Sequence, residues 1–550
     1  MSGEHRIGNP RRVPEPSRDE AAVFGGVGRV GVRAEVPEGD GLRSASLAPS
    51  TRQAVAAPDE GAASTSEEAA VPATASASPA PEPPAPLSRF ARFMRSKAAL
   101  VVVYIAFTGA YLGASGARLR HHSQYNHYVY LADCWLHGRL ALAGQPPNEN
   151  DWAKVDVLKL KDGRELRGTY GSRTGGPVDR FYPLRGAAET VPPEQIVSRS
   201  TIRYVSFPPL PAVLMLPLVA IYGLNFNDIL FTALWAALNP VLLLLLLRDL
   251  RRRGLSRRTD VEDLWLVTMF GVGSVYYYCS VVGEVWFTAL VVCVTLGIGY
   301  AWASLDAKRP VLAGICMGLG YAARPPWLVF PLFLLEAVRV SGGWHALRTR
   351  AGWRELMPRL IRFGVPFAAI ILALLWHNYA RFERPFEFGH RFLNIQWQER
   401  IQRYGLFNYH FLSRNLTCAL LLLPRILNKW PYVRISDHGM SLLVTSPNLA
   451  YVVAPKDRSY LTRSLWLTVA FAALPSLLYQ SSGYIQFGYR YSLDYMIFLM
   501  MLLAIGNRPL SRVFKGLVVV SFAINLFLAI IFDRYMEFSY DDSFFPHGNG

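Results

Sequence analysis

ILFTALWAALNPVLLLLLLRDLRRRGLSRR, residues 229–258, joins two features that recur along the whole chain. Its first part is apolar for about the length that a helix needs to cross the hydrocarbon of a bilayer. Its last part is a short arginine-rich loop, and loops of this kind collect on the cytoplasmic side of membrane proteins. The stretch therefore predicts a membrane span that ends at the inner surface.

Similar apolar runs are found throughout the 550 residues, of which 51% are hydrophobic and 13% aromatic. We count about eleven spans, which predicts an all-α polytopic membrane protein. The predicted spans are residues 98–116, 226–247, 261–281, 285–304, 310–323, 326–338, 363–379, 441–454, 463–480, 489–505 and 514–532.

The formal net charge of +17 comes largely from Lys and Arg in the short loops between these runs. Because the positive-inside rule explains such loops, we do not predict a nucleic-acid partner. The proline-rich run FPPLPAVLMLPLVAIYG at 207–223 is interpreted as a re-entrant or interfacial helix, since a further crossing there would put the loop at 248–258 outside. With that choice the basic loops lie inside, and the segments 117–206, 380–440 and 481–488 lie outside.

The two ends of the chain differ from this apolar body. Residues 1–96 are rich in Ala, Pro, Glu, Ser and Gly and lack an apolar period, which predicts a disordered tail. The tail has no apolar h-region with a cleavage site, and its basic end RFARFMRSK favours a cytoplasmic N-terminus. The transmembrane domain is predicted at 97–532 and a short outer C-terminal tail at 533–550. We expect the protein in the inner (plasma) membrane as a multi-pass protein.

The first outer loop carries two local signals. In VDVLKLKDGRELRGTY, alternating residues flank Asp162-Gly163, a two-residue turn that is typical of a β-hairpin. In YNHYVYLADCWLHGRLAL the apolar positions recur at three and four residues, which predicts an amphipathic helix on the outer membrane face. The expected fold is therefore helical, with outer amphipathic helices and a small β element.

Four polar clusters interrupt the apolar pattern at the predicted outer ends of spans. They are Glu284, Arg324, the stretch WHNYARFERPFEFGHRF at 376–392, and the pair Arg490 and Asp494. Each has a plain structural interpretation: a solvated interfacial carboxylate, arginines that snorkel to headgroups, or an ion pair four residues apart on one helical turn. All four nevertheless fall on one side of the membrane, whereas independent anchors are expected on both.

Arginines beside aromatics and an apolar groove suit a phosphate or pyrophosphate attached to a lipid chain. Arg makes bidentate, permanently charged contacts to phosphate oxygens, and aromatic rings stack on sugar faces. Glycosyl transfer further needs a carboxylate to activate the acceptor hydroxyl, and a cation to stabilise the departing phosphate. The clusters therefore predict a lipid-phosphate site that can support transfer of a sugar.

The order of the motifs resembles the membrane-embedded class C glycosyltransferases, the group that includes the protein mannosyltransferases and the bacterial lipid A aminoarabinose transferases. The matching pieces cover roughly residues 98–505. They are a first span followed by YLADCWLHGRL, then YVSFPPLPAVLMLPLVAIYG, GYAARPPWLVFPLFLL, NYARFERPFEFG and FGYRYSLDYMIFLMMLLA. The resemblance implies a sugar donor carried on a polyprenyl phosphate, used on the outer face with inversion at the anomeric carbon.

One departure concerns the catalytic base. Such enzymes usually place an acidic residue, often an Asp-Glu pair, shortly after the first span, where this chain has Gln124 and Tyr125. Asp133 and Glu284 are the candidates for the base. Asp151 and Asp179 in the long loop are weaker candidates, because nothing in the sequence determines their position.

The function that we predict is transfer of a sugar from a polyprenyl-phosphate donor to a lipid, glycan or protein acceptor. The alternatives are a catalytically silent protein that binds a lipid-linked glycan, and a transporter, whose inverted repeats are not visible in the sequence. Donor-phosphate contacts are assigned to Arg324, Arg384 and Arg490. Sugar or acceptor contacts are assigned to Trp286, Asn378, Glu387, His390, Tyr489 and Asp494. No spaced metal-ligand motif is present, so a divalent metal is compatible with the site but is not required by any residue pattern.

Overall fold

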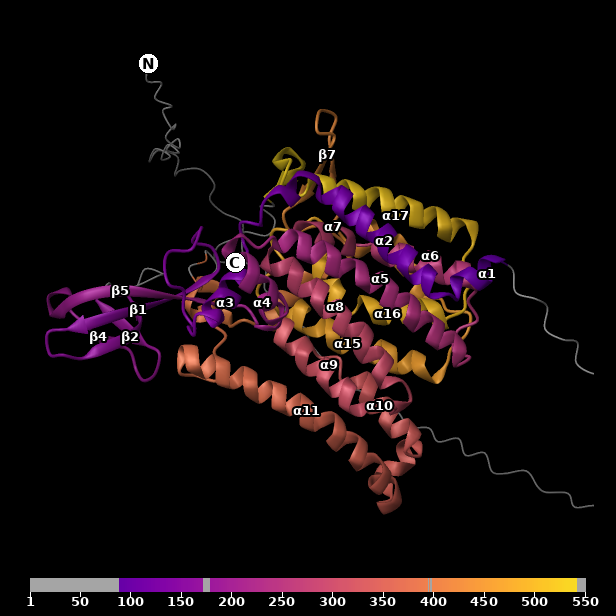
Figure 1. Ribbon diagram of the computed structural model, residues 1–550, viewed down its shortest axis with the longest axis horizontal. Helices are drawn as coiled ribbons and strands as arrows, with labels where there is room; N and C mark the ends of the chain where they lie inside the picture. The colour runs from indigo at the N-terminus through magenta and orange to yellow at the C-terminus, as the bar shows by residue number, and fades with distance from the viewer. Residues whose placement is uncertain (1–88, 172–178, 394, 396–397, 542–550) are drawn as a thin grey trace, which may run out of the picture. The chain divides into compact units, whose positions relative to one another are not determined.

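The computed structural model describes residues 89–171, 179–393, 395 and 398–541, and most of them are helical (Figure 1). The predicted disordered tail therefore lies outside the described residues up to residue 88. The last residues of the predicted tail, 89–96, belong to the described structure, which differs from the prediction of disorder. Arg89–Met94 form helix α1, and the Ser96 side chain accepts from the Ala99 N–H and so caps the next helix.

The α-helices follow one another from α1 to α17. Their bounds are α1 (Arg89–Met94), α2 (Lys97–Ser115), α3 (His127–Leu136), α4 (Leu210–Tyr222), α5 (Asp228–Arg252), α6 (Asp260–Gly271), α7 (Tyr276–Val282), α8 (Glu284–Ser304), α9 (Pro310–Ala323), α10 (Pro331–Val340), α11 (Arg350–Phe382), α12 (Gln398–Tyr404), α13 (Leu412–Leu420), α14 (Leu442–Thr445), α15 (Tyr460–Leu478), α16 (Met496–Ile505) and α17 (Arg512–Ile531).

Within the described residues, six helical segments are long and apolar enough to cross a membrane. They are Lys97–Arg120, Asp228–Arg252, Glu284–Ala307, Arg350–Phe382, Tyr460–Leu478 and Arg512–Ile531. The pair α6 and α7, bent by 55° at the break between them, would make a seventh span, and Leu210–Asn225, Pro310–Ala323 and Met496–Ile505 are shorter apolar helices. The protein is thus a helical membrane protein, but the predicted count of about eleven spans is not confirmed.

Three of the predicted spans show why the counts differ. The run at 441–454 contains only the four-residue helix α14 and the 3₁₀ segment Pro447–Val453. The runs at 310–323 and 326–338 form the short helices α9 and α10, which Pro325 and Pro326 keep apart because proline lacks the N–H that helix continuation needs. Hydrophobicity alone does not distinguish such broken segments from full spans.

The proline-rich run at 207–223 forms α4, as the interpretation of a short helix requires. Pro211 lies in its first turn, where proline is tolerated, and Pro217 lies within the helix. One face of α4 packs against α3, while Val213 and Ile221 are exposed. Its re-entrant or interfacial position in the membrane stays a prediction.

The predicted first outer loop, residues 117–206, contains a five-stranded antiparallel sheet, which is larger than the predicted hairpin. Its strands are β1 (Trp152–Leu160), β2 (Glu165–Tyr170), β3 (Arg180–Pro183), β4 (Glu189–Thr190) and β5 (Ile196–Val205), in the order β4-β3-β2-β1-β5. The β1–β2 pairing ends at Lys159 opposite Glu165, so Asp162-Gly163 lie in the connecting turn as predicted. Gly163 has φ +86°, a conformation that favours glycine.

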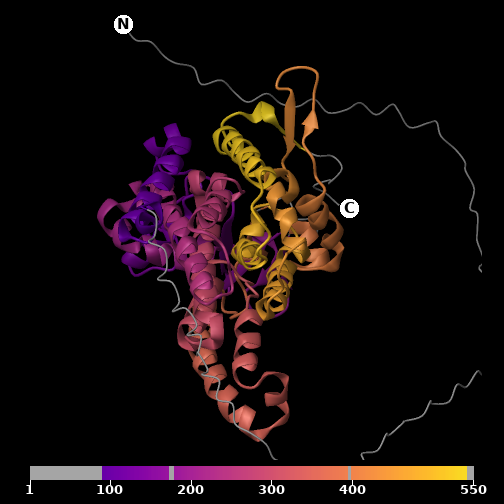
Figure 2. The same ribbon diagram turned by 90° about the vertical axis from the view of Figure 1, so that its right-hand side faces the viewer.

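A second, small sheet connects the predicted second outer loop, residues 380–440, to residues near the end of the chain. Strands β6 (Arg425–Ile426) and β7 (Val433–Ser436) form a hairpin, and β7 pairs in parallel with β8 (Ser539–Tyr540). Figure 2 shows this hairpin extending away from the helices. Part of the predicted C-terminal tail is therefore folded: residues up to 541 belong to the described structure.

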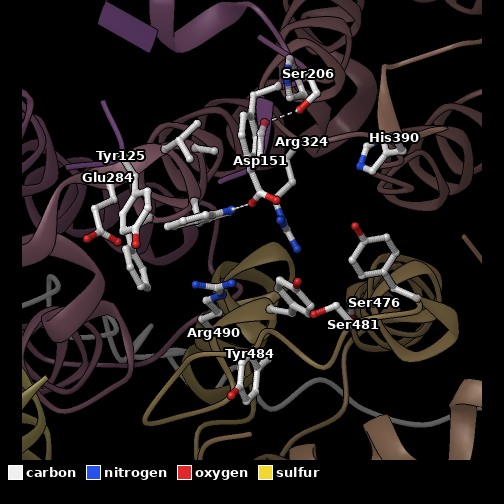
Figure 3. Close-up of a pocket in the computed structure, with 18 of the residues that line it drawn as sticks. Tyr125, Asp151, Ser206, Glu284, Arg324, His390, Ser476, Ser481, Tyr484 and Arg490 are labelled. Atoms are coloured by element: carbon white, nitrogen blue, oxygen red, sulfur yellow. Dashed lines mark hydrogen bonds between the residues drawn. The ribbon is translucent and has the colours of Figure 1, made fainter. Parts of the chain in front are cut away.

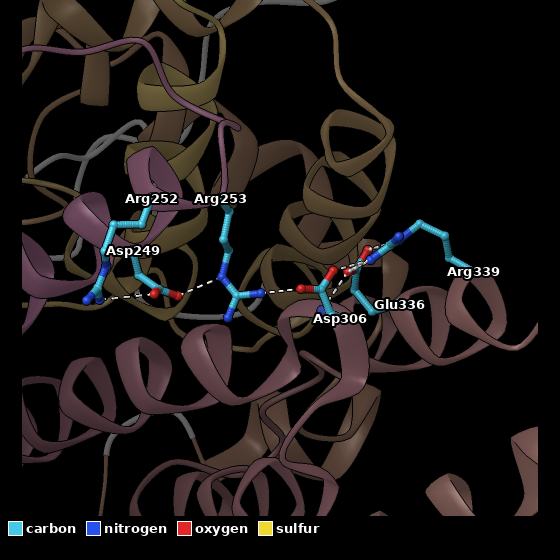
Figure 4. Close-up of polar contacts among 6 residues, drawn as sticks. All are labelled: Asp249, Arg252, Arg253, Asp306, Glu336 and Arg339. Atoms are coloured by element: carbon cyan, nitrogen blue, oxygen red, sulfur yellow. Dashed lines mark hydrogen bonds and ion pairs between the residues drawn. The ribbon is translucent and has the colours of Figure 1, made fainter. Parts of the chain in front are cut away.

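A chain of charged side chains ties α5, the turn after α8, and α10 together. Its members are Asp249, Arg252, Arg253, Asp306, Glu336 and Arg339 (Figure 4). Asp306 accepts from both Arg253 and Arg339, and its own N–H donates to Glu336 at 2.9 Å. The basic loops of this region are thus built into the fold through carboxylates, in addition to any effect of their charge on orientation.

The core is formed where α8 and α16 pass through the helical body. Every residue of α16 is buried, and α8 contacts α5, α9 and α16. The 3₁₀ segment Arg490–Asp494, η9, lies directly before α16 and contacts α8 and α15. This packing brings the beginning of α8, the end of α9 and η9 together at one place.

Candidate active site

A cavity of about 760 Å³ opens where these elements meet the first outer loop. Its volume is in the range of sites that hold a small-molecule ligand. Its lining includes side chains from the first loop, from the start of α8, from the end of α9 and from η9 (Figure 3). The polar ones discussed below are Tyr125, Asp151, Ser206, Glu284, Trp286, Arg324, His390, Arg490, Asp494 and Asp533.

Asp151 is held in the cavity by hydrogen bonds to its side chain and to its backbone. The Trp286 indole N–H donates to its carboxylate at 3.1 Å, and the Ser206 hydroxyl donates to its carbonyl at 3.2 Å (Figure 3). Its backbone is left-handed, with φ +59°, a conformation that strained functional residues often adopt. Burial raises the pKa of Asp151 to about 6, although the Trp286 hydrogen bond and the charge of Arg490 act to lower it.

The loop before β1 is fixed by residues around Gln124. The Asn148 amide donates to the Gln124 carbonyl at 2.6 Å and accepts from the Trp152 indole at 3.4 Å. His127 bonds the Asn150 carbonyl at 3.1 Å and stacks on the Trp152 ring, with centroids 4.0 Å apart. Burial lowers the pKa of His127 to about 4, so its ring is neutral. Asp151 is thus attached to the segment where the resemblance predicts an acidic pair.

Glu284 lines the same cavity from the first residue of α8. Its side chain is 7% exposed, and its backbone is left-handed with φ +59°. The preceding Gly283 also has a positive φ, +74°, and a Cβ there would lie 2.9 Å from the Ile229 Cα, so only glycine fits. The Glu284 N–H donates to Asp228 at 3.2 Å. These contacts aim Glu284 beside Tyr125, as Figure 3 shows.

The predicted pairing of Arg490 with Asp494 is wrong. Both oxygens of Asp494 are taken by Arg324 Nε, at 2.7 and 2.9 Å, and the Trp327 indole donates to the Asp494 carbonyl at 3.1 Å. The prediction assumed an α-helix, in which residues four apart share a face. Residues 490–494 form a 3₁₀ helix with about three residues per turn, so the two side chains point in different directions.

Arg490 is left as a buried cation facing the cavity. It is 4% exposed, and among the described residues its guanidinium has no ion pair or hydrogen bond. The Arg490 guanidinium carbon lies 5.0 Å from the centroid of the Phe287 ring and 5.7 Å from that of the Tyr491 ring. Its backbone N–H donates to Gln486, whose amide in turn donates to the carbonyls of His438 and Ser482 at 2.9 and 2.7 Å.

Four of the eleven predicted site residues are anchored in other contacts and do not line the cavity because their region packs elsewhere. Asp133 pairs with Arg139 at 3.6 Å and with His137 at 3.4 Å. In the 376–392 stretch, Asn378, Arg384 and Glu387 bond to the Pro385 carbonyl, the Leu184 carbonyl and the Gly389 N–H. This stretch packs against the five-stranded sheet, where Phe382 contacts Tyr204.

Tyr489 is also outside the cavity lining: it is fully buried and its hydroxyl lies 3.4 Å from that of Ser476. His390 does line the cavity, and its Nδ1 has no hydrogen-bond partner within the part of the chain that the structure describes. Burial lowers the pKa of His390 to about 4, so it is a neutral polar group there. The residues that the structure brings together are Glu284, Trp286, Arg324, His390, Arg490 and Asp494.

Among the described residues, no group of three His, Cys, Asp or Glu side chains is placed to hold a metal ion. Tyr125, Ser206 and Asp533 join the site without having been predicted. Their roles depend on chain segments that meet only in the folded protein, and no spacing in the sequence signals them. Asp151 could have been weighted more heavily only if the position of its loop had been known.

No protein-family model matches the sequence, and no curated protein matches it. Among solved structures, the chain is similar to the crystal structure of the oligosaccharyltransferase of Archaeoglobus fulgidus in the apo form. The two are 13% identical with a TM-score of 0.39, and the similarity covers 82% of this chain and 56% of that one. The chain thus spans about half the length of that structure. Because the similarity is so distant, the function has to be argued from the cavity itself.

Proposed function

We propose that the protein is a membrane glycosyltransferase. It transfers a sugar from a polyprenyl-phosphate donor to a lipid, glycan or protein acceptor on the outer face of the inner membrane, with inversion. Its N-terminus is cytoplasmic in this proposal, and its partners are the donor, the acceptor and membrane lipids. The observation that carries the proposal is Arg490, a buried guanidinium that faces the cavity and, among the described residues, forms no ion pair or hydrogen bond with a carboxylate.

A buried charge without a partner is costly, and a protein retains one where a ligand supplies the counter-charge. A phosphate ester fits Arg490 because a guanidinium donates to two phosphate oxygens at once. Arg324 is not equivalent to it, because Asp494 already neutralises that arginine. We therefore assign the donor phosphate to Arg490, with Arg324 and Asp494 forming the wall beside it.

Asp151, in the lining of the same cavity, supplies what transfer to a hydroxyl needs. The carboxylate of Asp151 accepts the proton of the acceptor hydroxyl as the acceptor oxygen forms a bond to the anomeric carbon. The bond from that carbon to the phosphate oxygen breaks, and its electron pair leaves with the polyprenyl phosphate, whose charge faces Arg490. A single displacement of this kind inverts the anomeric carbon.

The aromatic side chains around Asp151 suit the sugar. Tyr125 and Trp286 lie with their ring centroids 4.9 Å apart at the same wall, and rings of this type pack on sugar faces. Glu284 lies beside Tyr125 and is the second candidate for the base. Of the two carboxylates, only Asp151 accepts a hydrogen bond from Trp286, and this contact favours Asp151 as the base.

The test is transfer of label from radiolabelled polyprenyl-phosphate sugars to lipid or polymer acceptors, in membranes with and without the protein. We expect Asp151→Asn and Arg490→Met to abolish transfer, Glu284→Gln to retain it in part, and Asp133→Asn, a carboxylate outside the cavity, to retain it. Loss of transfer in Asp133→Asn alone would refute the assignment of the base. Binding of a prenyl phosphate without transfer from any donor would favour the catalytically silent protein.

A further inference from the structure

A surface separate from the cavity begins at α13. This nine-residue helix exposes Leu412, Leu416 and Leu420, which recur every four residues and so share one face. Its other face is buried and contains Asn415, Cys418 and Ala419. An amphipathic helix on a protein surface usually turns its apolar face inward, and α13 turns that face outward.

The chain continues this exposed apolar surface into the β6–β7 hairpin. Leu421 and Leu423 follow α13, and the hairpin adds Ile426, which is 79% exposed, Trp430, which is 67% exposed, and Tyr432. Isolated exposed apolar side chains are common, but eight of them within twenty-one successive residues, Leu412 to Tyr432, indicate an interaction surface. We call residues 412–434 the leucine–tryptophan segment.

The charge of this segment has one sign. Between residues 412 and 436 the sequence contains four basic residues, Arg414, Arg425, Lys429 and Arg434, and no acidic residue. Arg425, Lys429 and Arg434 are exposed beside the apolar side chains. Basic side chains together with Trp, Tyr and Leu fit the surface of an anionic bilayer, where aromatic rings and cations lie at the headgroups.

The contacts of the segment place it at the end of two candidate spans. The Asn415 amide donates to the carbonyls of Leu477 and Tyr479 at 3.1 and 2.7 Å, at the end of α15. Arg434 donates to the Glu537 carbonyl at 3.0 Å, six residues after α17 ends. Since α15 and α17 are both long and apolar enough to cross a membrane, the segment lies where such helices leave the hydrocarbon.

We propose that the leucine–tryptophan segment is an interfacial membrane anchor, which docks into the headgroup region of an anionic phospholipid bilayer. The leucine stripe of α13 and the hairpin tip insert among the headgroups, while Lys429 and its basic neighbours bind lipid phosphates. One lining residue of the cavity, Phe407, lies close to this anchor, because the neighbouring Asn408 N–H donates to the Leu478 carbonyl at 2.9 Å, at the end of α15 that Asn415 also contacts. The anchor therefore holds this side of the cavity at the leaflet surface, and this does not depend on the reaction catalysed.

Site-directed spin labelling of the full-length protein in nanodiscs tests the proposal. Trp430→Cys carries the label, and Lys161→Cys on the turn between β1 and β2 is the matched exposed control. The five native cysteines are all buried, and unlabelled wild-type protein measures any background from them. The label is compared in discs of phosphatidylglycerol and of phosphatidylcholine by its collision rates with oxygen and with a water-soluble nickel complex.

In phosphatidylglycerol we expect the label at 430 to be shielded from nickel and accessible to oxygen, whereas the label at 161 remains accessible to nickel. Lys429→Gln should weaken docking in phosphatidylglycerol about fivefold, the effect of one basic side chain near an anionic surface, and change little in phosphatidylcholine. A label at 430 that is as accessible to nickel as the one at 161 in both lipids would overturn the proposal and point to a protein partner. Shielding that is equal in detergent and in both lipids would also overturn it.

Discussion

The two arginines of the cavity, Arg324 and the more deeply buried Arg490, should respond in opposite ways to the same substitution. Arg324 neutralises Asp494 through two contacts of 2.7 and 2.9 Å, whereas Arg490 has no such partner among the described residues. Methionine preserves much of the volume of arginine and removes its charge. Arg324→Met therefore leaves a buried carboxylate without its ion-pair partner, and Arg490→Met removes a buried cation that forms no ion pair with any described residue.

The expected magnitudes follow from this difference. Removing one partner of a buried ion pair costs about 3–5 kcal/mol, so Arg324→Met should lower the thermal stability of the ligand-free protein clearly. Arg490→Met should leave that stability unchanged or raise it. A hydrogen bond to a charged group contributes about 1.5–3 kcal/mol, so Arg490→Met should weaken binding of a lipid phosphate roughly 10- to 150-fold.

Thermal unfolding of the detergent-solubilised protein, followed with and without farnesyl phosphate, measures both effects. Wild-type protein should be stabilised by farnesyl phosphate, Arg490→Met should show the wild-type melting temperature without that stabilisation, and Arg324→Met should melt at a lower temperature in its absence. Farnesol, which lacks the phosphate, is the ligand control. If Arg490→Met melts as low as Arg324→Met without ligand, Arg490 is a structural cation and the reasoning fails.

Three further outcomes are expected. Trp286→Phe removes the hydrogen bond that lowers the pKa of Asp151 below the value that burial alone would give, so the pKa rises above about 6. Since the base acts as carboxylate, the acidic limb of the pH profile of kcat/KM should move to higher pH; an unmoved limb would exclude Asp151 as the base. Gln486→Leu should weaken farnesyl phosphate binding without touching the ligand, because Gln486 holds the backbone of Arg490, and unchanged affinity in titrations would contradict this. Gly283→Ala should lower the free energy of unfolding by about 1–3 kcal/mol, because the φ of +74° at this position is left-handed and Ile229 of α5 leaves no space for a Cβ atom. A melting curve like that of the wild type would contradict this expectation.

Local patterns predicted several elements correctly. The helix over YLADCWL is α3, the turn at Asp162-Gly163 joins β1 and β2, and the proline-rich run at 207–223 contains the short helix α4. Each of these depends on residues close together in the chain. The size of the sheet was not predicted, because β5 pairs with β1 across some forty residues and its pattern is not a simple alternation.

Only part of the candidate site was predicted, because contacts between distant segments decide which polar side chains meet in the cavity. Glu284 and Arg490 could be identified because a charged residue within an apolar run is conspicuous. The cluster at 376–392 was equally conspicuous, but Asn378, Arg384 and Glu387 are used by contacts to nearby backbone and to the sheet. Asp151 stands in the polar run NENDW and was only a weaker candidate for the base, because nothing in that run determines where its carboxylate lies.

The sequence by itself determined that this chain is a helical membrane protein, and it limited the site to a few charged residues near apolar runs. Hydrophobicity and periodicity are properties of neighbouring residues, so they can be read along the chain. The tertiary structure alone decided which charges meet: Asp494 pairs with Arg324 across 170 positions, and Trp286 reaches Asp151 across 135. Those distant contacts neutralise Arg324, hold Asp151 in the cavity, and leave Arg490 as the buried charge that is free to bind an anion, because pairing in a folded chain depends on packing and not on sequence separation.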